Sequence, residues 1–104
     1  MVEGKLIGHN TDGRGFLRSL TDDAGFDPRG KRFFIMGAGG AARAIGFSLA
    51  LAGAAGIGLR DVDREKAEAL VGDIRNKTGV SATAVRDEAI ETSARAADCL
   101  VNAT

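Results

Sequence analysis

The chain has 104 residues, of which 44% are apolar, and its 14 basic side chains balance 14 acidic ones. That length accommodates one domain with an ordinary hydrophobic core. The balanced charge and the lack of Trp and Tyr argue against nucleic acid or an anionic membrane as a partner. A single cysteine excludes an internal disulfide and a cysteine-based metal site. Because no signal peptide or membrane span is recognisable, we expect a cytosolic protein.

The first thirty residues predict a turn followed by a helix. A strand-like segment at 5–7 leads into the polar run 8–13, and the apolar residues of 15–24 then recur at helical spacing. A cluster of turn-forming residues at 25–30 separates this helix from the next apolar run.

From residue 32 onward, strands and helices alternate. Compact apolar runs bounded by turn residues predict buried strands at 32–36, 55–59, 81–85 and 99–101. Apolar residues at helical spacing predict helices at 41–52, 63–77 and 86–97. This order predicts an α/β, Rossmann-like, three-layer domain with a parallel sheet. Because such sheets normally continue beyond four strands, we expect a chain truncated at both ends.

A glycine-rich turn joins the first of these strands to its helix. Residues 37–42 fit the pattern G-x-G-x-x-A of dinucleotide-binding turns. Gly37 permits the tight turn, Gly39 lets the backbone approach a pyrophosphate, and Ala42 allows close helix–strand packing. The candidate phosphate-binding residues are therefore Gly37, Ala38, Gly39, Gly40 and Ala41. The plain alternative is a glycine turn that only packs a helix onto a sheet.

An acidic residue follows the second predicted strand. Asp61 is placed to accept hydrogen bonds from the adenosine ribose hydroxyls of NAD, and its charge opposes the 2′-phosphate of NADP. Arg60 and Arg64 support the alternative, because an arginine can bind that phosphate. Asp63 is a further candidate ribose ligand, although capping the next helix is the commoner use of such a residue. The predicted cofactor is NAD, with NADP as the alternative.

Three motifs in the same order resemble those of one enzyme family. Residues 8–16 resemble the Gly-x-Asn-Thr-Asp-Gly-x-Gly-Phe signature of shikimate dehydrogenases. Residues 37–44 resemble the cofactor loop of that family, and 101–104 resemble its Asn-Ala-Thr-Pro strand end. The resemblance covers nearly the whole chain. It assigns residues 1–30 to a hinge segment and 31–104 to a dinucleotide-binding domain that is incomplete at its C-terminus.

The resemblance implies hydride transfer between NAD(P) and shikimate or quinate. It implies that Asp12 pairs with a lysine beside the substrate hydroxyl and assists proton transfer. Without the resemblance, the alternative role of Asp12 is to cap the N-terminus of a helix. The resemblance also adds the strand end to the cofactor site, as Asn102, Ala103 and Thr104.

The chain departs from the family pattern in two ways. NADP-using members usually carry Asn-Arg-Thr where this chain has Asp61, Val62 and Asp63, so that Val62 replaces an arginine that grips the 2′-phosphate. This difference resembles the NAD-preferring quinate/shikimate branch. The substrate domain with its lysine is also absent, so we expect the chain alone to be inactive.

The sequence allows two other interpretations of what the chain does, and three further residues have side chains with possible chemistry. The chain is alternatively a stand-alone nucleotide-binding or regulatory module; a methylenetetrahydrofolate-type or amino-acid dehydrogenase is disfavoured, because those proteins lack the Asn-Thr-Asp run. We interpret His9 as a turn residue and Cys99 as a buried, inert thiol. Arg43 either reaches a phosphate or faces solvent.

Overall fold

The chain forms one parallel sheet. The computed structural model describes residues 5–6, 13–23 and 25–103. The five strands have the spatial order β1-β5-β2-β3-β4, and every neighbouring pair is parallel. Their bounds are Lys5–Leu6 (β1), Arg32–Met36 (β2), Gly56–Arg60 (β3), Ser81–Ala84 (β4) and Cys99–Asn102 (β5).

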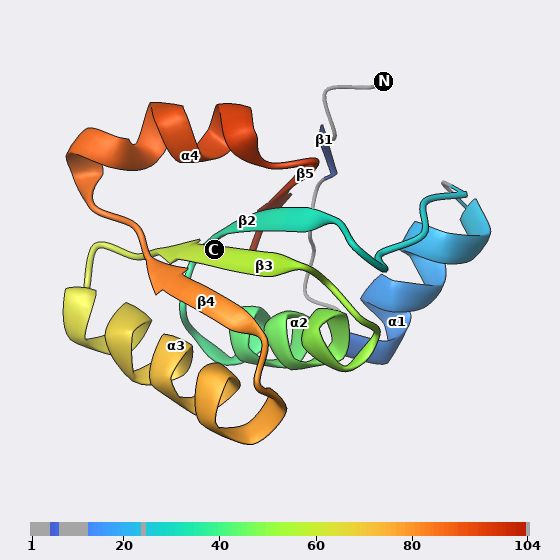
Figure 1. The fold of residues 1–104 in the computed structure, drawn as a ribbon, viewed down its shortest axis with the longest axis horizontal. Coiled ribbons are helices and arrows are strands. Elements are labelled where there is room, and N and C mark those ends of the chain that lie inside the picture. Colours follow the sequence, from blue (N-terminus) through green and yellow to red (C-terminus); the bar gives the residue numbers. More distant parts are fainter. Residues whose placement is uncertain (1–4, 7–12, 24, 104) are drawn as a thin grey trace.

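Helices cover both faces of this sheet (Figure 1). The helices α2 and α3 lie on one face and α4 crosses the other, while α1 packs beside α2. Their bounds are Gly13–Arg18 (α1), Gly40–Leu51 (α2), Arg64–Thr78 (α3) and Ile90–Ala96 (α4). This arrangement confirms the predicted three-layer α/β fold. Among the described residues, no helix is long and apolar enough to cross a membrane.

The main core lies between the sheet and the α2–α3 layer. In β2, Phe33 and Ile35 are buried and pair in register with Ile57 and Leu59 of β3. Facing side chains of the two helices complete the core: Ile45, Leu49, Leu70 and Ile74. The alternation of buried residues along β3 shows why its sequence predicts a strand with one face toward this layer.

Three predicted segments differ in detail from the structure. The helix expected at 15–24 is α1 followed by a π-helical turn, Ser19–Asp23. The helix expected at 86–97 starts as a 3-10 turn, Asp87–Ala89, and only then becomes α4, which buries no side chain. The strand-like segment near the N-terminus joins the sheet as β1, where it pairs with β5 and adds a fifth strand to the four predicted from residue 32 onward.

Candidate functional site

The glycine turn leaves β2 and enters α2 within three residues. Gly37 has a backbone φ of 121°, a conformation that side-chain-bearing residues rarely adopt. Its N–H donates to the carbonyl oxygen of Arg60 at 2.7 Å, which fastens the turn to the end of β3. The role predicted for Gly37 in the tight turn is therefore a structural requirement of this backbone.

The next two glycines are not required by packing. Gly39 is the N-cap residue of α2, has a φ of −85°, and supplies no side-chain cap. Among the described residues, a Cβ atom built on Gly39 or Gly40 meets no heavy atom within 4 Å. The first amides of a helix have no intrahelical acceptors, and they favour an anion. Open space in front of an uncapped helix N-terminus fits a phosphate group.

Asp61 links the glycine turn to the start of α3. Its Oδ2 accepts a hydrogen bond from the N–H of Ala38 at 2.8 Å, and its Oδ1 accepts one from the N–H of Asp63 at 2.8 Å. The bond from Asp63 lowers the pKa of the Asp61 carboxyl; partial burial opposes this, and the Ala38 bond and the nearby Lys66 and Arg60 add to the lowering. Asp61 is thus held as a carboxylate at neutral pH.

A cleft opens where these segments meet. It has a volume of about 370 Å³ and lies at the carboxyl ends of β2 and β3, the end where open α/β sheets bind ligands. Its lining residues are Met36, Gly37, Ala38, Gly39, Arg60, Asp61, Val62, Lys66 and Ala103. The structure therefore brings Gly37, Ala38, Gly39, Asp61, Val62 and Ala103 of the predicted site together.

Two predicted cofactor ligands have other partners. The carboxylate of Asp63 accepts hydrogen bonds from the backbone N–H groups of Glu65 and Lys66. Asp63 therefore caps α3, which is the commoner of the two roles predicted for it. Arg64 pairs with Glu68 one turn along the same helix at 3.2 Å. Neither side chain lines the cleft. Gly40 and Ala41 begin α2 beside it.

Lys66 lines the cleft and was not among the predicted residues. It lies in the first turn of α3, and side chains of a helix lean toward its N-terminus. The signal was available in the sequence, because a lysine three residues after a capping Asp63 leans back toward the turn that holds Asp61. Its ammonium contributes to the lowered pKa of Asp61.

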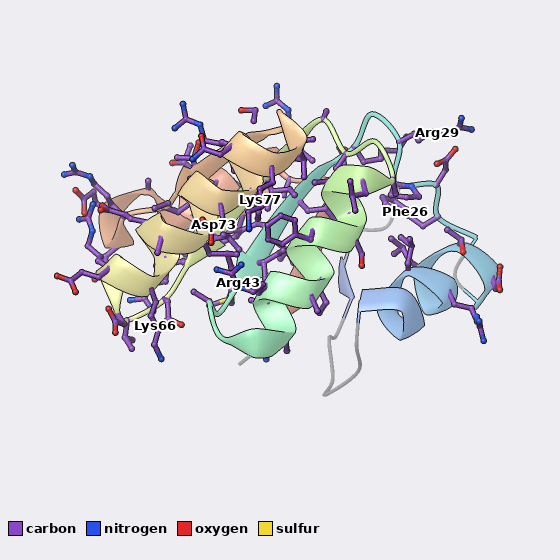
Figure 2. All side chains as sticks on the ribbon, turned by 90° about the horizontal axis from the view of Figure 1, so that it is seen from below. Phe26, Arg29, Arg43, Lys66, Asp73 and Lys77 are labelled. Carbon is purple, nitrogen blue, oxygen red and sulfur yellow. The ribbon has the colours of Figure 1, made fainter. Side chains whose placement is uncertain are left out.

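Arg43 pairs with the neighbouring helix. Its Nη2 lies 2.6 Å from Oδ2 of Asp73 on α3, and its guanidinium lies 5.7 Å from the centre of the Phe47 ring. Figure 2 shows Arg43 and Asp73 side by side between α2 and α3. Neither of the two alternatives for Arg43 described this contact, which ties α2 to α3.

Comparisons with known proteins converge on one family. The shikimate dehydrogenase (NADP+) of Methanopyrus kandleri is 48% identical over 103 residues, which are 97% of this chain and 36% of that protein. The shikimate 5-dehydrogenase of Listeria monocytogenes, solved in complex with shikimate and NAD, has a TM-score of 0.81 at 35% identity, over 93% of this chain and 35% of that one.

Two further solved structures are similar. The quinate dehydrogenase of Corynebacterium glutamicum in complex with NAD has a TM-score of 0.78 at 34% identity, over 93% of this chain and 34% of that one. The 5-ketofructose reductase of a Gluconobacter species has a TM-score of 0.74 at 45% identity, over 95% and 35%. Over almost its whole length the chain is similar to proteins of the shikimate and quinate dehydrogenase family. No family profile matches the chain, and it spans about a third of the length of the curated relatives it matches.

Of the three motifs that suggested the shikimate and quinate dehydrogenase family, the described residues contain the cofactor loop and most of the strand end. Asn102 closes β5 opposite Met36, and the N–H of Ala103 donates to the carbonyl of Met36 at 2.9 Å. Thr104, Asp12 and His9 lie outside the described residues, so the predictions for them stand as predictions.

Proposed function

We propose that the chain binds NAD at the cleft and supplies this site to an enzyme that transfers a hydride between NAD and shikimate or quinate. The observation that carries the proposal is the position of Asp61, whose carboxylate lines the cleft while bonded to the glycine turn. When bound, the nicotinamide dinucleotide supplies the hydride acceptor or donor.

Four of the lining residues have a defined role in this proposal. The N–H of Ala38 is already bonded to Asp61, so the amides that hold the pyrophosphate come from Gly39 and the first turn of α2. The ribose hydroxyls donate to the lone pairs of Asp61 that the backbone bonds leave unused. Val62, 85% exposed at the rim, presents an apolar side chain to the adenine.

The preference for NAD over NADP rests on the charges around Asp61. A carboxylate at this position repels a 2′-phosphate, and Val62 offers it no donor. Of the two arginines considered as ligands of that phosphate, only Arg60 lines the cleft, and it is paired with Asp87; Arg64 is paired with Glu68 outside the cleft. Relatives of both kinds exist: the Listeria and Corynebacterium enzymes were solved with NAD, whereas the Methanopyrus enzyme is named for NADP+. NADP is therefore the alternative.

The proposal assigns the substrate-side chemistry to Asp12. Its carboxylate binds the substrate hydroxyl and assists proton transfer together with a lysine from outside these 104 residues. Residues 1–30 serve as the hinge that presents Asp12 to the nucleotide domain.

A second candidate is reduction of a keto-sugar. The 45% identity to a 5-ketofructose reductase favours it, because that enzyme is similar over the same stretch of this chain. Both candidates use the same nucleotide site and differ only in the substrate. The stand-alone binding module is the non-catalytic alternative. Such a module would bind nucleotide, but it would turn over neither substrate when fused to the part of a relative that supplies the lysine.

The test of the nucleotide site is a calorimetric titration of the chain with NAD, compared with Asp61→Asn. We expect the variant to bind NAD at least about tenfold more weakly, since it loses charge-assisted hydrogen bonds to the ribose. Asp63→Asn is the matched control, because it removes the same charge two residues away and asparagine caps helices as well as aspartate does.

The outcome that contradicts the proposal is equal NAD affinity in the wild type and Asp61→Asn. An asparagine has only one oxygen, so the variant leaves one backbone N–H without its acceptor, at a cost of about 1–3 kcal/mol. A circular dichroism melt of each variant therefore accompanies the titration and separates unfolding from loss of the ligand contact.

A further inference from the structure

We propose that Asp87 is a positioning residue for cofactor selection: by holding the guanidinium of Arg60, it keeps the cleft selective against a 2′-phosphate. This inference rests on the proposed nucleotide site and extends it to a residue from a different loop. Asp87 is the first residue of the 3-10 turn that follows β4, far in sequence from both the glycine turn and Asp61.

Arg60 connects the cleft to Asp87. It is the last residue of β3, its carbonyl holds the N–H of Gly37, and its side chain lines the cleft beside Asp61. Its guanidinium donates twice to the same oxygen, with Nε 3.2 Å and Nη2 2.8 Å from Oδ1 of Asp87. The Arg60 side chain is 22% exposed, against 78% for Asp87.

The chemistry of arginine explains why its partner matters. A guanidinium offers a planar fork of donors that matches a phosphate, and it keeps its charge at every relevant pH. An arginine beside the ribose carboxylate is therefore a potential ligand of a 2′-phosphate. The bond to Asp87 occupies two of its donors and offsets its charge.

The charged residues that line the cleft, Arg60, Lys66 and Asp61, carry one net positive charge. Asp87, which is paired with Arg60, offsets that charge from outside the lining. Removing the charge of Asp87 leaves the cleft with one net positive charge and frees the fork of Arg60, and both changes favour the more anionic nucleotide.

The same pair contributes little to folding. An ion pair with one largely exposed partner adds at most marginal stability, because water screens it. Asp87 can therefore be replaced without loss of the fold, and its effect on selection can be measured separately.

The experiment titrates the full chain with NAD and with NADP, which differ only in the 2′-phosphate, and compares the ratio of the two affinities between variants. For Asp87→Asn we expect the ratio to move toward NADP by about three- to tenfold, the effect of one added charge at partial exposure. Glu68→Gln is the matched control, since it frees Arg64 and removes the same charge outside the cleft; it should leave the ratio unchanged. The double variant Arg60→Gln/Asp87→Asn should lose the gain.

The outcomes separate this inference from the proposed function. If the wild type binds NAD and Asp87→Asn has the same ratio, Asp87 does not govern selection and only this inference fails. It also fails alone if Glu68→Gln shifts the ratio as much as Asp87→Asn does. If the wild type already prefers NADP, this inference and the proposed preference for NAD both fail, whereas the nucleotide site itself stands. If the wild type is folded by circular dichroism yet binds neither nucleotide, the nucleotide site itself is wrong.

Discussion

At the scale of single residues, two neighbouring glycines of one motif are present for different reasons. Gly37 is needed by the backbone, whose φ of 121° would strain any other residue. Within the described part of the chain, neither backbone strain nor packing requires Gly39, because its φ is ordinary and the space beside it is open. A sequence motif combines both demands, and the structure separates them.

This difference predicts opposite outcomes for the same substitution. Gly37→Ala should lower the free energy of unfolding by about 1–3 kcal/mol, the usual cost of an L-residue in such a conformation. Gly39→Ala should cost less stability, at most about 1 kcal/mol because alanine is a poorer N-cap residue than glycine, but it should weaken NAD binding, because its methyl group enters the space proposed for the pyrophosphate. Thermal melts and titrations of both variants check this; a stable Gly37→Ala that binds NAD normally would contradict the account.

The site residues that sequence reasoning finds are those fixed by local backbone demands. The glycines and Asp61 stand at set distances from predicted strand ends, so their place in the fold follows from the order of the elements. Asp87 joins the site through a tertiary contact with Arg60. No pattern in the sequence pairs those two residues, and this is why the prediction did not include Asp87.

At the scale of elements, the strands were predicted more accurately than the helix starts. The run at 32–36 matches β2 at both ends, because a strand buried on both faces is continuously apolar. Ile90 is the one large apolar residue of the segment at 86–97. The segment starts as a 3-10 turn whose first residue, Asp87, is bonded to Arg60, and it becomes α-helical only at Ile90. Periodicity alone contains no information about such a contact.

The ends of α3 show the opposite case, in which local signals are sufficient. Asp63 accepts two backbone N–H bonds at its start, and Gly79, with a φ of 77°, ends it. Asp63→Ala should therefore destabilise the chain by about 1 kcal/mol, and Asp63→Asn by much less. Urea denaturation followed by circular dichroism measures both; equal losses in the two variants would show that the charge of Asp63, and not the cap, is what matters.

At the scale of the whole molecule, the core is closed around the central strands. Cys99 starts β5, is 2% exposed and pairs with Phe33 of β2. Burial, with a further effect of the nearby Asp98, raises the pKa of the Cys99 thiol to about 11 from its ordinary 9.0. The predicted burial of Cys99 is therefore confirmed, and its low reactivity stays a prediction.

The buried thiol makes a reporter of global unfolding. Because the folded state raises the pKa of Cys99, the protonated thiol favours folding: this contribution is complete below pH 9 and is lost as the pH rises through 11. At pH 8, iodoacetamide should modify the native chain far more slowly than the chain in denaturant, at a rate that follows the melting curve. A native rate equal to the denatured one would mean that β5 opens independently of the rest.

The two backbone bonds of Asp61 bear on any attempt to redesign the cofactor. The same carboxylate that would select the nucleotide also holds the glycine turn against the start of α3. A substitution of Asp61 that changes cofactor selectivity therefore also loosens the loop proposed to bind the phosphates. Val62 is exposed and has an apolar side chain, and Asp87 is paired with Arg60 of the cleft. Substitutions at these two positions are therefore expected to change cofactor selection while the backbone bonds of Asp61 stay in place.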